Sequence, residues 1–220
     1  MDNTVVGIGA TIIHKYTAWL AHIIVDSNHR NKGIGKFITQ SLVDSLDRST
    51  CHTILLIATQ LGLPVYERIG FEKETEYVFL RDGKTSGNIQ ADVTPFHVRY
   101  QKEIYALDQI VSGENRRQLL EPHLPAAKLI IQNNKLEGLF LPTLGEGLII
   151  SCTPEVGNEL VNLKHSDGRK ASIPQDNKPG IDFLLQHGYQ EFYRGIRMRL
   201  GKKITWQPDK IYGRIGGNLG

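Results

Sequence analysis

The feature that most constrains the fold of this chain is a change of pattern near residue 30. Ala18–Val25 (AWLAHIIV) is an apolar run interrupted by one histidine, which is typical of a strand buried on both faces. A polar loop follows it. From Gly35 the apolar residues recur at helical spacing as far as about Asp47. The chain therefore joins a buried strand to an amphipathic helix through a short loop, an arrangement that favours an α/β fold.

The loop itself has the chemistry of an anion site. Gly33 and Gly35 stand where the helix opens, and Arg30 and Lys32 add positive charge beside them. The first turn of a helix presents N–H groups without an internal partner at its electropositive end. Glycine lets the backbone approach a phosphate without a Cβ in the way. A glycine-rich turn before an ordinary helix is the alternative, and this short pattern alone does not decide between them.

Spacing excludes two other phosphate-binding loops. The chain has no G-x-x-x-x-G-K-[ST] segment, so the loop is not a nucleoside-triphosphate P-loop. It has no G-x-G-x-x-G segment either, which argues against a dinucleotide-binding fold.

The rest of the chain also alternates between segments with the apolar pattern of strands and segments with the apolar spacing of helices. The polar stretch Asp82–Asp92 is the best candidate for a domain boundary or a long hairpin tip. β-Branched runs and helical spacing predict strands at Thr4–His14, Thr53–Ala58, Phe71–Arg81, Lys128–Gln132, Gly138–Leu141, Leu148–Ser151, Ala171–Pro174 and Tyr189–Leu200, and helices at Leu63–Ile69, Gln101–Gln109, Asn115–Leu120, Pro154–Leu163 and Pro179–His187.

Composition narrows the class of protein. A formal net charge of +3 is too weak to indicate nucleic-acid binding by itself, and the basic residues that thicken after Arg194 are best interpreted as a solvated strand face and tail. Cys51 and Cys152 are far apart and lack metal-ligand spacing, so we expect two reduced thiols and no metal. The sequence shows neither a membrane-spanning run nor a signal peptide, and we expect the cytoplasm.

The segment Trp19–Phe71 resembles the GNAT superfamily of N-acetyltransferases. The stretch IIVDSNHRNKGIGKFI looks like the coenzyme A motif of that family, in which R/Q-x-x-G-x-G/A follows an apolar strand. The stretch LPVYERIGF looks like its second motif, in which a tyrosine, here Tyr66, lies four residues before a Gly-Phe pair. Two motifs in the right order, joined by a helix and a strand, are far more specific than either alone.

The resemblance implies acetyl-coenzyme A as co-substrate and a role for each matching residue. Tyr66 would lie near the thioester sulfur and protonate the departing thiolate, which a phenol with an ordinary pKa near 10 can do. Backbone groups of Ile23, Ile24 and Val25 would pair with the pantetheine arm. The pyrophosphate would be held by Arg30, Asn31, Lys32, Gly33, Ile34, Gly35 and Lys36.

The chain also departs from the family pattern. Thr59 and Gly62 stand where the family often has asparagine and alanine, and Trp19 stands where many members have a glutamate base. His22 is nearby, but strand alternation places it on the opposite face from Trp19, and we interpret it as structural. In the second half, Glu137 and Glu146 are candidate bases, although solvated charges are the better interpretation.

The second half of the chain resembles a degenerate copy of the same fold. Gly70 and Gly188 stand 118 residues apart (188 − 70), each followed by an aromatic strand starter. At this offset Leu184 takes the place of the tyrosine, and the phosphate-loop equivalent, CTPEV at residues 152–156, has no glycine pair. We therefore expect a tandem GNAT-like fold with domains at 1–91 and 92–220, the first without the strand, two helices and further strand that usually begin the family fold.

The sequence thus predicts a mixed α/β protein (α+β, with a mixed sheet) that is an acetyl-coenzyme A-dependent N-acetyltransferase. The acetyl group would pass by direct attack to an amine of a small molecule or peptide. A catalytically inactive acyl-coenzyme A-binding module is the first alternative, and a nucleic-acid-associated protein that uses the late basic residues is the second. A homodimer stays open. The glycine-rich tail Ile211–Gly220 is interpreted either as a flexible end or as a segment packed across the domain junction and anchored by Tyr212 and Ile215.

Overall fold

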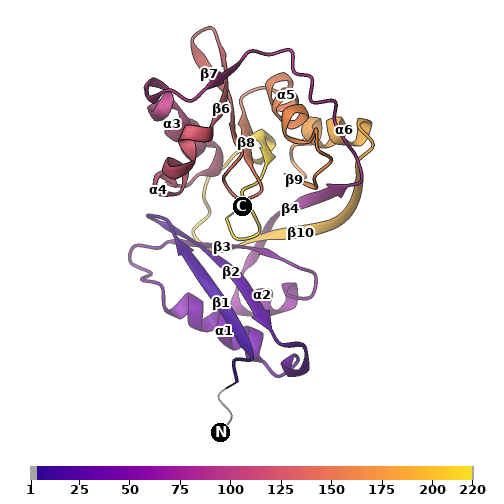
Figure 1. Cartoon of the computed structure of the whole chain (residues 1–220). Coiled ribbons are helices and arrows are strands. Elements are labelled where there is room, and N and C mark those ends of the chain that lie inside the picture. The colour runs from indigo at the N-terminus through magenta and orange to yellow at the C-terminus, as the bar shows by residue number, and fades with distance from the viewer. Residues whose placement is uncertain (1–3, 220) are drawn as a thin grey trace. The chain divides into compact units, whose positions relative to one another are not determined.

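A computed structural model describes residues 4–219, and these divide into two compact units built from separate stretches of the sequence (Figure 1). Unit 1 contains the residues up to Glu74, Ile196–Ile204 and the residues from Gly217. Unit 2 contains Thr75–Gly195 and Thr205–Gly216. Two long strands, β4 (Glu72–Arg81) and β10 (Gln190–Gly201), contribute residues to both units. The predicted division between residues 91 and 92 concerns two copies of a family fold, and it stays a prediction.

Unit 1 is a mixed sheet with two helices. Its strands follow the order β1-β2-β3-β10. The β1–β2 and β3–β10 pairs are antiparallel and the β2–β3 pair is parallel, as the mixed-sheet prediction requires. Besides the ends of β4 and β10, the elements are β1 (Gly7–Ile13), β2 (Thr17–Val25), the 3-10 helix η1 (Ser27–His29), α1 (Ile34–Asp44), β3 (Thr53–Ala58) and α2 (Leu63–Ile69).

The core of unit 1 lies between one face of this sheet and its helices. Leu20 from β2, Leu56 from β3 and Met198 from β10 are buried together with Val43 of α1, and Figure 1 shows α1 and α2 against the same strands. The helix α1 ends three residues before the predicted end at Asp47. The Asp47 carboxylate instead accepts the Ser49 N–H at 2.9 Å, which forms a turn that competes with the helix.

Unit 2 contains a second sheet, and all its strand pairs are antiparallel. Its strand order is β11-β8-β7-β6-β5. Strand β4 belongs to the other, six-stranded sheet, where it lies between β10 and β9 and pairs antiparallel with β9. Among residues 4–219, no helix is long and apolar enough to cross a membrane. The elements are β5 (Val93–Pro95), η2 (Val98–Tyr100), α3 (Gln101–Ser112), α4 (Arg117–Leu120), η3 (Glu121–Ala126), β6 (Lys128–Gln132), β7 (Lys135–Leu141), β8 (Leu148–Ser151), α5 (Pro154–Lys164), β9 (Ala171–Pro174), α6 (Lys178–Gln186), η4 (Pro208–Lys210) and β11 (Ile211–Gly213).

The two predicted anchor residues of the glycine-rich tail are buried, and packing across the domain junction stays a prediction. Tyr212 and Ile215 are buried in unit 2, with 2% and 1% of their surface exposed. The Tyr212 ring lies so close to two helical glycines that a Cβ at Gly157 would come within 2.3 Å of it, and one at Gly180 within 2.9 Å. The ring therefore fits only because both positions lack a side chain.

The late basic residues are largely engaged with carboxylates. Arg197 and Glu74 are both buried in unit 1 and lie 2.9 Å apart. In unit 2 the Arg194 guanidinium lies 3.0 Å from a Glu76 oxygen, and Arg214 also forms an ion pair with a glutamate. Charge that is neutralised in this way contributes little to the attraction of a phosphate backbone.

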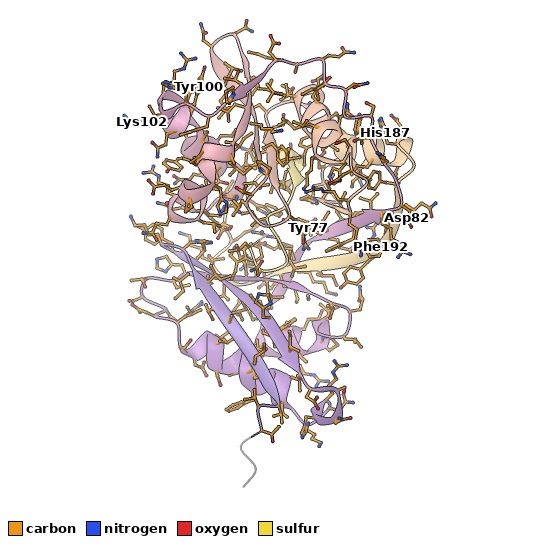
Figure 2. All side chains as sticks on the ribbon, in the orientation of Figure 1. Tyr77, Asp82, Tyr100, Lys102, His187 and Phe192 are labelled. Atoms are coloured by element: carbon orange, nitrogen blue, oxygen red, sulfur yellow. The ribbon has the colours of Figure 1, made fainter. Side chains whose placement is uncertain are left out.

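Capping of α5 gives a first prediction about stability. The Thr153 hydroxyl accepts the Val156 N–H at 3.4 Å. We expect Thr153→Ala to lower the free energy of unfolding by about 1 kcal/mol, because that N–H loses its partner. Urea unfolding should show a lower midpoint with the same slope. Lys102→Ala is the control, since Lys102 is an exposed side chain on α3 (Figure 2) and should change stability by less than about 0.5 kcal/mol. Equal midpoints for the two variants would contradict the cap.

Candidate active site

An opening between two neighbouring strands forms the first part of the site. The parallel pairing of β2 with β3 extends from Thr17–Trp19 opposite Thr53–Leu55 and stops there. Both strands continue, β2 as far as Val25 and β3 as far as Ala58. Beyond Trp19 this side of β2 therefore offers backbone donors and acceptors to an extended ligand, in the manner of an added strand.

A β-bulge lies in the same part of β2. Ile8 pairs with Ile24 but Ala10 pairs with Ala21, so β2 has one residue more than β1 over this stretch. His22 has a φ of 51°, the left-handed region that non-glycine residues rarely adopt. Leu20 and Ile23 consequently both reach the core of unit 1, although strict alternation would place them on opposite faces. The alternation used to place His22 is therefore interrupted at His22 itself.

The turn from β2 into α1 leaves backbone N–H groups available. Asn31 and Gly33 have φ values of 62° and 80°, which turn the chain sharply into the helix. Gly33 caps α1 without any side-chain hydrogen bond, and the first helical bond runs from Phe37 N–H to the Gly33 carbonyl at 3.0 Å. The N–H groups of residues 34–36 thus point out of the helix end, where an anion can accept them.

The two glycines of this turn are required for different reasons. Gly33 needs its left-handed backbone, which other residues adopt at a cost. Gly35 has no such need, and a Cβ there would meet only a Val25 methyl at an ordinary 3.8 Å. Glycine inside a helix nevertheless costs about 1 kcal/mol relative to alanine. The space beside Gly35 is therefore not filled by the packing of the chain, and a ligand could approach the backbone closely there.

These features line one cavity of about 760 Å³, formed within unit 1. Among its described lining residues are the cations Arg30, Lys36 and Arg68, and none is an aspartate or a glutamate. The wall is therefore suited to a polyanion. Of the predicted site residues, Lys32 is exposed and outside the lining, whereas the cavity is lined by Ile23, Ile24, Val25, Arg30, Asn31, Gly33, Ile34, Gly35, Lys36 and Tyr66.

Tyr66 reaches the cavity from α2. Its ring lies edge-on to Phe71, with 6.0 Å between the ring centroids, at the start of the strand that follows α2. Burial raises the pKa of the Tyr66 hydroxyl above its ordinary value near 10, because the phenolate would lose solvation. The phenol therefore stays protonated throughout the physiological range and can act as an acid.

Gly62 determines where the Tyr66 ring can lie, and it gives a second prediction. A Cβ at Gly62 would come within 2.8 Å of the ring. We expect Gly62→Ala to push the ring aside and to lower turnover about tenfold, with little loss of stability, because a small misplacement of a catalytic group is costly. Initial rates and thermal melting check this. Gly35→Ala is unsuitable as a control because it alters the cavity, so Gln60→Ala, an exposed change in the preceding loop, serves instead. Equal rates for both variants would contradict the positioning role.

Sequence reasoning missed other parts of the wall. Arg68 follows Tyr66 by two residues, so the helical segment could have indicated it. Gly217 lies far along the chain and no local signal marks it. Trp19 is fully buried, with the Arg197 guanidinium 4.9 Å from its ring centroid. Among the described residues, no three His, Cys, Asp or Glu side chains form a group that could hold a metal ion.

The sequence is similar to known proteins. Residues 1–73 match the family described as Acetyltransferase (GNAT) domain. The chain is 24% identical over 213 residues to a protein called uncharacterized N-acetyltransferase YitH from Bacillus subtilis (strain 168), and the match covers 90% of this chain and 75% of that protein.

Solved structures show a similar fold. A putative acetyltransferase from Pyrococcus horikoshii has a TM-score of 0.84 at 24% identity, covering 98% of this chain and 76% of that one. A tandem GNAT protein from the clavulanic acid biosynthesis pathway has a TM-score of 0.54 at 13% identity, covering 93% of this chain and 82% of that one. The chain therefore has a GNAT-like mixed α/β fold, and its residues 1–73 are similar to the GNAT acetyltransferase domain.

Proposed function

We propose that this protein is an acetyl-coenzyme A-dependent N-acetyltransferase that acts on an amine of a small molecule or peptide. The observation that carries the proposal is the cavity in unit 1, which is lined both by the first residues of α1 and by Tyr66. One end suits a pyrophosphate and the other supplies an acid, and acyl-coenzyme A joins a pyrophosphate to a thioester through an extended arm.

The residues present fit that co-substrate. The N–H groups of Ile34, Gly35 and Lys36 would hold the pyrophosphate, with Arg30, Asn31, Lys32 and Gly33 shaping the loop and supplying charge. The Arg30 Nε donates to the Val25 carbonyl at 3.2 Å, which ties that side chain to the end of β2. Backbone groups of residues 23–25 would pair with the amides of the pantetheine arm. The open space at Gly35 is where the phosphates would lie.

This arrangement supports direct transfer of the acetyl group. The acceptor nitrogen attacks the thioester carbonyl carbon while the carbon–sulfur bond breaks, and the leaving thiolate takes a proton from Tyr66. The raised pKa of Tyr66 keeps that proton available at neutral pH. Backbone donors near the end of β2 would stabilise the charge that develops on the carbonyl oxygen.

We also propose that residues 92–220 form a degenerate second copy that lacks a coenzyme site, next to a first copy at 1–91. Gly70 and Gly188 both have left-handed backbones, at φ 105° and 81°. Gly70 is the C-cap of α2, and Gly188 directly follows the C-cap of α6. The similarity to a solved tandem GNAT protein supports this interpretation. In the second copy Leu184 is fully buried in the core of unit 2, at the position that corresponds to Tyr66.

The corresponding helix in this second copy is α5, and its first turn has few N–H groups without a partner. Pro154 occupies the first turn of α5 and has no N–H, and the Thr153 hydroxyl accepts another. The adjoining cavity has a volume of about 200 Å³, roughly a quarter of the one in unit 1. An anion at this helix end would therefore find few free donors. The second copy would have a structural role and would help to determine which acceptor can bind.

Calorimetric titration of the full chain with acetyl-coenzyme A tests the proposal. We expect binding of one molecule per chain, and a release of free thiol when a suitable amine is added. The described cavity wall has no carboxylate base, which favours an inactive acyl-coenzyme A-binding module as the second candidate. That module would bind acetyl-coenzyme A but release no thiol with any amine. Absence of binding would overturn both candidates.

A further inference from the structure

The bulge in β2 brings one proton-accepting side chain to the wall of the cavity. His22 lines the cavity and is exposed. It is the residue at which the register between β1 and β2 shifts, and its φ is 51°. Strained backbone of this kind persists where the surrounding structure holds it, and it gathers at functional sites. His22 therefore needs an explanation beyond that of an ordinary strand residue.

The bulge also determines the side on which His22 lies. Leu20 and Ile23 both contact the core between the sheet and α1. Two residues, Ala21 and His22, stand between them where alternation allows only one. Strict alternation with Leu20 would assign His22 to the helical face, but the bulge interrupts it, and the His22 side chain is exposed. His22 lines the cavity, whereas Trp19, which stands where the family resemblance implies a base, is fully buried and outside the described lining.

Distance along the strand brings His22 to the reacting end of the co-substrate. The pyrophosphate would lie beyond Val25, at the start of α1. A strand advances about 3.3 Å per residue, so the three residues from Val25 back to His22 span roughly 10 Å. An extended pantetheine arm that follows β2 in this direction carries its thioester toward His22. Tyr66 lines the same cavity from α2.

We propose that His22 is a catalytic residue, the general base that takes the proton from the acceptor amine. This inference rests on the proposed acetyltransfer. The nitrogen–carbon bond forms and the carbon–sulfur bond breaks, His22 gains the amine proton, and Tyr66 gives a proton to the sulfur. Water then carries a proton from His22 to Tyr66, so both side chains return to their initial states. Histidine is the side chain that most often performs such a step.

The other ionisable groups of the cavity fit this division of roles. Arg30, Lys36 and Arg68 are cations that cannot accept a proton at neutral pH, and Tyr66 is already protonated. His29 also lines the cavity, but its Nδ1 lies 2.8 Å from an Asp26 carboxylate oxygen at the loop. His22 is thus the described lining residue best placed to accept a proton from an amine near the thioester.

Two variants of the full chain test this role. His22→Asn removes the base but keeps a residue that tolerates a positive φ, and His22→Gly leaves a gap that added imidazole can enter. The assay follows thiol release from acetyl-coenzyme A with glucosamine, spermidine, lysine and a peptide with a free amino terminus. We expect His22→Asn to lower kcat about 100-fold at pH 7, with an unchanged Kd for acetyl-coenzyme A. The loss should shrink as the pH rises and the amine deprotonates in solution, and imidazole should restore turnover to His22→Gly.

A matched control and the contrary outcomes complete the design. His52→Asn changes an exposed histidine in unit 1 whose ring stacks on Tyr16 outside the cavity lining, and its pH profile should equal that of the unchanged protein. Turnover of His22→Asn that matches the unchanged protein at every pH overturns the role of His22 alone. Binding of acetyl-coenzyme A without thiol release by the unchanged protein overturns acetyltransfer itself, and the base with it.

Discussion

Replacing Gly35 by glutamate should weaken acetyl-coenzyme A binding by about three orders of magnitude, since two charge-assisted hydrogen bonds at roughly 2 kcal/mol each would be lost. The structure leaves space beside Gly35 that no side chain of the chain fills. A glutamate would put both bulk and negative charge where the pyrophosphate is proposed to lie. The fold should survive, because a helical position gains propensity when glycine is replaced. Calorimetry gives the Kd, and thermal melting gives the stability.

Ser41→Glu is the matched control for this change. It adds the same charge to an exposed position of the same helix, away from the cavity lining. We expect its Kd to stay close to that of the unchanged protein, with a small electrostatic effect that salt removes. If both variants weaken binding equally, net charge and not the shape of the loop determines affinity, and the placement of the pyrophosphate at α1 is wrong.

The sequence predicted most of the architecture because its signals were local. The apolar run before Arg30 and the helical spacing after Gly35 predicted β2 and α1. Every other predicted helix and strand is present, several with the predicted ends and the others with ends that differ by a few residues. Two short strands, β5 (Val93–Pro95) and β11 (Ile211–Gly213), were not predicted. Each has three residues, too few for a period to appear, and their pairing partners are remote in sequence.

The cavity was predictable in part for the same reason. The loop at Gly33 and the segment around Tyr66 carry their chemistry in consecutive residues. The bulge at His22 left no trace, since the run AWLAHIIV is apolar almost throughout and gives no alternation to interrupt. Gly217 reaches the wall through the fold alone. A single sequence indicates features that are formed by consecutive residues, whereas the bulge and the place of Gly217 depend on how distant segments pack.

Replacing Tyr66 by phenylalanine should lower kcat about 1000-fold while the Kd for acetyl-coenzyme A stays unchanged, because only the proton donor is removed. The ring and its edge-on contact with Phe71 remain. Burial raises the pKa of Tyr66 above its ordinary value near 10. A raised pKa means that the acid form persists at neutral pH, so the unchanged protein should show no loss of rate from this group near pH 7. Stopped thiol-release assays across pH provide the measurement.

Tyr16→Phe is the control for the hydroxyl. Tyr16 is an exposed tyrosine of unit 1 that stacks on His52 outside the cavity, and its loss should leave kcat unaltered. An inactive binding module predicts that Tyr66→Phe behaves like this control. A variant that loses affinity and rate together would show instead that Tyr66 holds the co-substrate and donates no proton.

The gap between β2 and β3 has a consequence for the protein before it meets any ligand. Where the pairing of Trp19 with Leu55 ends, the sheet has two strand edges in its interior, and a second chain can in principle add to such edges. The apolar residues of both strands make the segment self-associating when it is uncovered. An extended ligand that pairs with these edges would occupy their backbone groups and leave none for a second chain. We therefore expect the purified protein to aggregate more slowly at raised temperature when acetyl-coenzyme A is present. The delay should increase with the fraction of chains that have the ligand bound.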